Sequence, residues 1–153
     1  MLTPGSMLGG RYQLKGNAGG TITACEPPRH LALTWEMRGD VSWVDVTLKQ
    51  IKPQQTQLTL EHVAFVPEAI WDEYGPGGVG VGWDLGLWGL ELHLAAPETD
   101  NSGAQAWTTS PEGVSFQRGL NDSWCEASIA YGTPPEAARA AAERTSKFYT
   151  GDS

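Results

Sequence analysis

The feature that most constrains the fold of this chain is a series of five short segments, rich in β-branched and aromatic residues, that lie between residues 10 and 65 and are separated only by turn residues. This pattern is typical of strands joined by hairpins, and it predicts strands at residues 11–15, 21–26, 31–37, 42–50 and 57–65. A parallel crossover needs about a dozen residues or more, and the connections here are much shorter. The sequence therefore predicts a five-stranded antiparallel meander.

Alternation along the predicted strands separates an apolar face of the sheet from a polar one. The residues expected on the apolar face are Leu33, Trp35, Val44, Val46, Leu60 and His62. Those expected on the opposite face are Asp45, Thr47, Thr59 and Glu61. A slip of one residue would exchange the two sets and bury the polar one. Because an apolar sheet face must be covered by another layer, a covering element is expected downstream.

A long helix is predicted over residues 78–96, where large apolar residues recur at helical spacing. These residues are Val79, Trp83, Leu87, Leu90 and Leu94. The helix is expected to pack on the apolar face of the sheet. Gly82, Gly86 and Gly89 interrupt its pattern, and each costs about 1 kcal/mol relative to alanine. Three explanations stay open: a close approach of the helix backbone to the sheet, the wall of an internal cavity, and a contact between subunits.

The rest of the chain predicts a loop followed by two helices. Residues 97–113 are polar and aperiodic, as in a loop. Apolar residues then recur at helical spacing from Phe116 to a stop at Gly132. The run Thr133-Pro134-Pro135-Glu136 matches a capping box in front of an alanine-rich helix that ends near Tyr149. With C-terminal helices at 114–150, the predicted fold class is α+β, strands first and helices after, in a single domain of residues 1–153.

Charge and composition exclude several classes of partner. The 153 residues carry a net charge of −8 and no basic cluster, so nucleic acid is not an expected partner. The apolar stretch 79–96 is short for a membrane span and contains three polar residues, Asp84, Glu91 and His93. The N-terminus shows no leader pattern. We therefore expect a soluble, cytoplasmic protein without a membrane span.

No cofactor or metal site is expected from the motifs. Cys25 and Cys125 are far apart in the sequence, and the three histidines do not have the spacing of metal ligands. The glycines of residues 75–80 satisfy the dinucleotide-binding pattern G-x-G-x-x-G. However, the pattern does not follow a strand directly and does not open a βαβ unit, so it indicates a glycine-rich start of a helix.

His62 is the most informative polar residue, because its alternation with Leu58 and Leu60 points it to the apolar face of the sheet. A buried imidazole needs a hydrogen-bond partner. His62 is then either a core histidine, bonded to a neighbour such as Asp84 or to a backbone carbonyl, or a residue that orients a ligand or exchanges protons in a cavity. His62 and Asp84 are therefore the candidate catalytic residues.

Several runs of residues together resemble one known superfamily. They are Gly19-Gly20-Thr21-Ile22-Thr23, Glu26-Pro27-Pro28-Arg29-His30-Leu31, Leu33-Thr34-Trp35-Glu36, Leu58-Thr59-Leu60-Glu61-His62, Tyr74-Gly75-Pro76-Gly77 and Val79-Gly80-Val81-Gly82-Trp83-Asp84-Leu85. With the order of the predicted elements, they resemble the SRPBCC (START-like) superfamily, and within it bacterial proteins related to the activator of heat-shock-protein-90 ATPase. The resemblance implies a helix-grip fold, in which a curved antiparallel sheet wraps a long helix and leaves an apolar cavity.

The resemblance implies several activities, because the superfamily includes lipid and hormone binding, polyketide cyclisation and co-chaperone action. The hypothesis we favour is the binding of a small, largely apolar molecule between the sheet and the 78–96 helix. Its expected contact residues are Trp35, Val44, Val46, Leu60, His62, Trp83 and Leu87. The alternatives are a chaperone-linked interaction with another protein, and an enzyme of the cyclase or hydrolase kind that uses His62. The sequence offers no second convincing catalytic group, which favours binding.

The N-terminus departs from the superfamily pattern. The resemblance implies a strand and two short helices before the first predicted strand, whereas this chain starts at Met1. A shortened chain would expose a sheet edge and apolar surface, and both invite association. We therefore expect a homodimer in which the open edge or the helices of residues 116–149 take part.

Overall fold

A computed structural model describes residues 7–98 and 103–151 of the chain. The chain divides into two compact units, Met1–Phe65 and Val66–Ser153. Among the described residues, the first unit holds the strands and the second unit holds the helices. The fold class is therefore α+β, as predicted, with a five-stranded antiparallel sheet, a long helix and C-terminal helices, the elements of a helix-grip fold.

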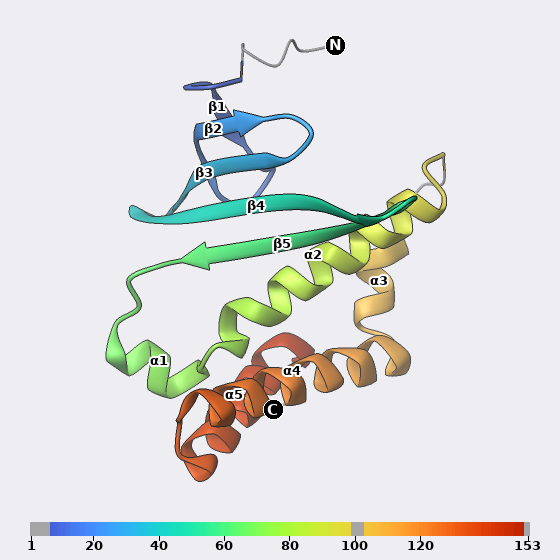
Figure 1. Ribbon diagram of the computed structural model, residues 1–153. Coiled ribbons are helices and arrows are strands. Elements are labelled where there is room, and N and C mark those ends of the chain that lie inside the picture. The colour runs from blue at the N-terminus through green and yellow to red at the C-terminus, as the bar shows by residue number, and fades with distance from the viewer. Residues whose placement is uncertain (1–6, 99–102, 152–153) are drawn as a thin grey trace. The chain divides into compact units, whose positions relative to one another are not determined.

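The sheet is a meander, in agreement with the prediction. Its strands are β1 (Arg11–Gln13), β2 (Gly19–Glu26), β3 (His30–Met37), β4 (Asp40–Lys52) and β5 (Gln55–Val63). They follow one another across the sheet in chain order, each antiparallel to the next (Figure 1). His30, one residue before the predicted strand of residues 31–37, is the first residue of β3.

Two tight turns set the register of the central strands. Met37 pairs with Asp40, so the β3–β4 hairpin has a two-residue loop, Arg38 and Gly39. Both loop residues have positive φ, +55° and +94°. This is the combination that a type I′ turn requires, and glycine adopts it without steric cost. The β4–β5 hairpin is also short, because Lys52 pairs with Gln55.

The register confirms the two faces that alternation predicts. Val44 lies between Leu33 and His62, and Val46 lies between Leu31 and Leu60. Directly opposite residues of paired strands share a face. The apolar face of the sheet is therefore formed by Leu31, Leu33, Trp35, Ser42, Val44, Val46, Leu58, Leu60 and His62. Asp45 and Thr47 pair with Glu61 and Thr59 on the polar face, as expected.

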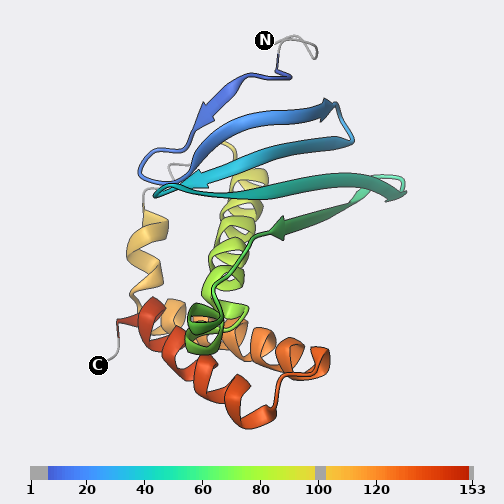
Figure 2. The same cartoon turned by 90° about the vertical axis from the view of Figure 1, so that its left-hand side faces the viewer.

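The second unit contains the helices. They are α1 (Glu68–Tyr74), α2 (Gly77–Ala95), α3 (Ala104–Thr108), α4 (Pro111–Tyr131) and α5 (Pro135–Thr150). The long helix α2 confirms the prediction for residues 78–96 to within one residue at each end. Helices α4 and α5, coloured orange to red, lie side by side (Figure 2). Helix α4 ends at Gly132, whose φ of +117° stops the helix in the left-handed region.

Two local predictions in this unit are wrong. The predicted loop of residues 97–113 contains α3 and the first turn of α4, while residues 99–102 of it lie outside the described residues. Ser110 starts α4 by accepting a hydrogen bond from the Gly113 N–H, with Pro111 in the first helical position. Thr133 does not cap α5; its hydroxyl oxygen instead accepts a hydrogen bond from Ser128, and the N-cap position is Pro134.

Close packing between α2 and α4 accounts for a glycine in the long helix. At Gly80, a methyl group would overlap the ring of Trp124, so only glycine lets the two helices approach at this point. Gly82 faces α5, where an added methyl group would lie 3.0 Å from the Tyr149 hydroxyl. Gly80 and Gly82 therefore allow contacts between helices of one chain. This explanation is not among the three that the sequence leaves open. The predicted packing of α2 on the sheet stays a prediction.

Candidate functional site

The candidate site in the sheet is built around His62, near the end of β5. Its Nε2 lies 2.8 Å from the Ser42 hydroxyl oxygen, and that hydroxyl donates its proton to the Trp35 carbonyl oxygen at 3.1 Å. A serine hydroxyl has only one proton to give. His62 Nε2 must therefore carry a proton and donate it to Ser42. The three residues form a hydrogen-bonded series across β5, β4 and β3.

The protonation state of His62 follows from its surroundings. Burial lowers the pKa of His62 below its ordinary value of 6.5, because the sheet side chains around it solvate a charge poorly. The imidazole is therefore neutral near pH 7, with its proton on Nε2. In this tautomer the second ring nitrogen, Nδ1, is a hydrogen-bond acceptor and a weak base.

The sheet brings together five of the residues that the sequence predicts for the site. Val44 pairs directly with His62, and Val46 pairs directly with Leu60. Trp35 pairs with Ser42, and its ring centroid lies 6.1 Å from that of His62. Val44 is buried, and the other four are half-buried. The result is an aliphatic and aromatic surface with a small polar group, the imidazole and hydroxyl, set within it.

The remaining predicted site residues lie on α2, in the second unit. They are Trp83, Asp84 and Leu87. Asp84 is engaged in the packing of that unit, because its Oδ2 accepts a hydrogen bond from Trp124 Nε1 at 2.7 Å and so ties α2 to α4. A shared pocket of Trp35, His62, Trp83 and Leu87, and a catalytic role for Asp84, stay predictions.

Ser42 is a candidate site residue that the sequence analysis does not single out. A signal was present, because Ser42 stands two residues before Val44 and therefore shares its face. The pairing of Ser42 with Trp35 and its bond to His62 depend on the β3–β4 and β4–β5 registers. The sequence predicts Asp84 or a backbone carbonyl as the partner of His62, whereas His62 Nε2 bonds to the Ser42 hydroxyl.

The polar face carries a second histidine in a different environment. His30 Nε2 lies 2.7 Å from Asp45 Oδ2, with the His30 side chain partly exposed. The hydrogen bond to Asp45 raises the pKa of His30 above 6.5. This pair is a surface ion pair when His30 is protonated, and it lies on the face opposite to His62.

Within residues 7–98 and 103–151, no three His, Cys, Asp or Glu side chains come together in a way that could hold a metal ion. Over the same residues, none of the helices has the length and apolar character needed to cross a membrane. Burial raises the pKa of the Cys125 thiol, so the thiolate form of this residue is disfavoured.

Comparisons with known proteins match the sheet and the long helix. The family model of "Activator of Hsp90 ATPase homolog 1-like protein" matches residues 3–95, a span that runs from β1 to the end of α2. Helices α3, α4 and α5 lie beyond the match. A search of curated protein sequences finds no match.

Solved structures of one protein, CalU16 from Micromonospora echinospora, are similar to this chain. Its crystal structure has 31% sequence identity and a TM-score of 0.56, over 78% of this chain and 62% of that one. Its solution NMR structure has 27% identity and a TM-score of 0.53, over 94% of this chain and 64% of that one. The chain thus spans less than two thirds of the length of CalU16.

Proposed function

The chain belongs to the family of activator of Hsp90 ATPase homolog 1-like proteins, and from this membership together with the sheet geometry we propose that it binds a small, largely apolar molecule on the apolar face of its sheet. The observation that carries the proposal is the His62–Ser42–Trp35 series of hydrogen bonds set among aliphatic side chains. Ligand sites are typically apolar surfaces with a few placed polar groups that orient the ligand.

The parts of the site have separate roles in this proposal. Val44, Val46 and Leu60 contribute affinity by removing apolar ligand surface from water, at about 25 cal/mol per Å². Neutral His62 is proposed to orient the ligand through its imidazole ring, which the bond to Ser42 holds in place. Trp83 and Leu87 of α2 are proposed as further contacts. The chaperone-linked and enzymatic alternatives stay expectations of the family resemblance.

The test uses N-phenylnaphthylamine, an uncharged apolar dye whose fluorescence rises when it leaves water. The protein should bind the dye, and Leu60→Ala should weaken binding severalfold, because it removes apolar contact area from the face. Thr59→Ala is the matched control: Thr59 is the neighbouring β5 residue on the polar face. The proposal fails if the wild type does not bind the dye, or if both variants weaken binding equally.

His62→Leu separates the two readings of the histidine. Leucine keeps the apolar volume but can neither accept nor donate a hydrogen bond. If His62 orients the ligand, a stably folded variant should lose affinity for the dye. If affinity persists while only the melting temperature changes, His62 has no role in orientation.

Three broader expectations accompany this proposal. We propose that residues 1–153 act as one domain, that the protein forms a homodimer, and that it acts in the cytoplasm. One cooperative unfolding transition, seen equally by all probes, would support the single domain. Light scattering at micromolar concentration should give twice the chain mass of 16.5 kDa; a 16.5 kDa species with a concentration-independent melting temperature would contradict the dimer.

A further inference from the structure

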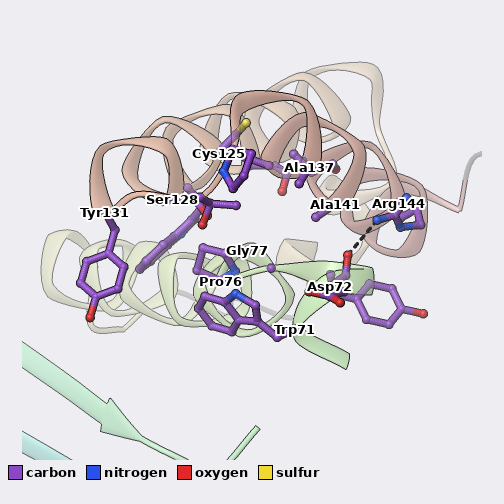
Figure 3. A pocket seen from close by; sticks show the side chains of 18 of the residues that line it. Trp71, Asp72, Pro76, Gly77, Cys125, Ser128, Tyr131, Ala137, Ala141 and Arg144 are labelled. Atoms are coloured by element: carbon purple, nitrogen blue, oxygen red, sulfur yellow. Dashed lines mark hydrogen bonds between the residues drawn. The ribbon is translucent and has the colours of Figure 1, made fainter. Parts of the chain in front are cut away.

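The helical unit contains a pocket of about 720 Å³ that none of the predicted site residues lines. It lies between α1 and the start of α2 on one side and α4 and α5 on the other (Figure 3). Helices α4 and α5 lie beyond the family match, which ends at residue 95. The pocket is therefore built in large part by residues outside the family's common region.

The walls of this pocket are mostly apolar. Aromatic rings come from Trp71 on α1 and from Trp124 and Tyr131 on α4, and small side chains come from Ala137 and Ala141 on α5. The charged residues in the lining are Asp72 and Arg144, of opposite sign. Arg144 donates hydrogen bonds to the backbone carbonyls of Asp72 and Glu73, so its guanidinium group already binds the C-terminal end of α1. Such a pocket favours a flat, neutral, mainly apolar molecule over an ion.

One lining residue has an unmet hydrogen-bonding need. Asn121 on α4 is 4% exposed, and its Nδ2 donates to the Ala142 carbonyl of α5. Its Oδ1 is buried and has no donor among the described residues. Native proteins pair the great majority of buried polar atoms, so such an oxygen calls for an explanation. An N–H or O–H group of a bound molecule could satisfy an amide oxygen of this kind.

The start of α2 lies next to this oxygen. A methyl group at Gly77 would lie 2.7 Å from Asn121 Oδ1, so the backbone of Gly77, which also lines the pocket, packs against it. The first turn of α2 is closed by a bond of 2.9 Å from Gly80 N to Pro76 O, beside two longer bonds, 3.3 Å from Gly78 N to Gly75 O and 3.4 Å from Val79 N to Pro76 O. A ligand donor would reach Oδ1 through a small displacement of the Gly77 backbone, and its hydrogen bond to Oδ1 would offset the cost of that displacement.

We propose that this pocket is a second binding site, for a flat, neutral, mainly apolar molecule that donates one N–H or O–H group to Asn121 Oδ1. The aromatic rings and the alanines of α5 contact the body of the ligand. The carbonyl oxygen of Asn121 selects molecules that carry a donor. This site involves no residue of the sheet and does not depend on the function proposed for the apolar face.

The test compares two probes of nearly the same shape, indole and benzothiophene, which differ in a donating N–H. Binding is followed by the backbone and side-chain amide signals of the isotope-labelled full chain. Indole should shift the Asn121 side-chain amide and the backbone amides of Cys125 and Ala141, which line the pocket. It should bind about fivefold tighter than benzothiophene, the factor that a typical net hydrogen bond provides.

Two variants make the test specific. Asn121→Leu removes the acceptor and should abolish the preference for indole. Ala137→Leu narrows the pocket from α5 without touching Asn121, and it should weaken both probes. Ala140→Leu is its matched control, the same substitution on the same helix at a residue outside the pocket lining, and it should leave both affinities unchanged.

The following results would overturn the proposal. Equal affinity of the wild type for the two probes would exclude a role for Asn121, and an unchanged preference in Asn121→Leu would do the same. If Asn121→Leu does not fold, the Ala137→Leu and Ala140→Leu pair decides: equal affinities of these two variants would show that the probes bind elsewhere. Shifts confined to the sheet would contradict this site while supporting the one proposed on the apolar face.

Discussion

His62 in the sheet and Asn121 in the helical unit are both polar side chains in largely apolar surroundings, but they differ in how their hydrogen bonds are satisfied. The Nε2 of His62 donates a hydrogen bond to the Ser42 hydroxyl, which in turn donates one to the Trp35 carbonyl oxygen. Asn121 donates from its amide nitrogen to the Ala142 carbonyl, and its amide oxygen has no donor within residues 7–98 and 103–151. A paired group holds its own neighbours in place, whereas an unpaired buried acceptor costs free energy until something donates to it.

This difference teaches where to look for binding in the two units. In the sheet, the imidazole of His62 is already oriented by its hydrogen bond to Ser42, so the ligand proposed there would meet a polar group fixed in place. In the helical unit, the ligand proposed for the pocket would supply the donor that Asn121 Oδ1 lacks among the described residues. The following predictions test this comparison.

The largest effect is expected at the contact that holds α2 against α4 beside Asn121. Gly80→Ala places a methyl group in the Trp124 ring, and overpacking of this kind costs about 1–3 kcal/mol, with larger values where the neighbours cannot move. Gly119→Ala on α4 is the matched control, because an added methyl group meets nothing within 4 Å there. Glycine is the weaker helix former, so this control should stabilise the protein by up to about 1 kcal/mol.

Chemical denaturation of the two alanine variants measures both changes. If Gly80→Ala unfolds at the same denaturant concentration as Gly119→Ala, the α2–α4 contact is not tight, and the burial of Asn121 Oδ1 beside it is in doubt.

The next largest effect is expected at the hydrogen bond between His62 and Ser42 in the sheet. Ser42→Ala removes the acceptor of the His62 N–H and leaves it unpaired, which should cost about 1–2 kcal/mol of unfolding free energy. Thr47→Ala on the polar face of the same strand should cost less, because Thr47 is exposed there. An equal loss in the two variants, measured by urea unfolding, would show that the His62–Ser42 bond does not contribute to stability.

A smaller effect is expected at Asn121. Asn121→Leu loses the bond to Ala142 but also removes an oxygen that has no donor, so the two changes should largely offset each other, to within about 1 kcal/mol. Thermal unfolding in the absence of added ligand measures the balance. A loss larger than that of Ser42→Ala would mean that Asn121 Oδ1 is satisfied in solution, and the contrast between the two units would disappear.

The smallest effect is a pH dependence that differs between the two faces of the sheet. The pKa of His62 is lowered by burial and that of His30 is raised by Asp45. His62 therefore makes the protein less stable as pH falls below about 6.5, because the unfolded chain binds the proton more readily. His30 adds stability below about 6.5, and this is lost as pH rises through its raised pKa.

Imidazole signals followed through a pH titration by NMR should show His62 titrating below His30. His30→Gln should remove the loss of stability that occurs as the pH rises through the raised pKa of His30, and it should leave the titration of His62 unchanged. The same titration midpoint for the two histidines would contradict the different environments of the two faces.

Much of the sheet could be predicted because its signals are local. Alternation with a period of two residues assigns Val44, Val46 and Leu60 to one face and Thr59 to the other, and short turns leave antiparallel pairing as the available arrangement. The stop of α4 at Gly132 is equally local, because glycine reaches positive φ without steric cost. The start of α4 at Ser110 also had a local signal, a serine before a proline, which the reading of residues 97–113 as a loop overlooked.

The candidate sites depended on tertiary structure. The sequence by itself determined that His62 shares a face with Leu60, but the strand registers decided that Ser42 would be its partner. The close approach of Gly80 to Trp124 joins residues far apart in the chain, and so does the hydrogen bond from Asn121 to Ala142, which leaves Oδ1 without a donor among the described residues. Periodicity shows which side of an element is apolar, but it carries no information about which atoms of another helix lie against it, because close packing is decided by the shapes of both surfaces together.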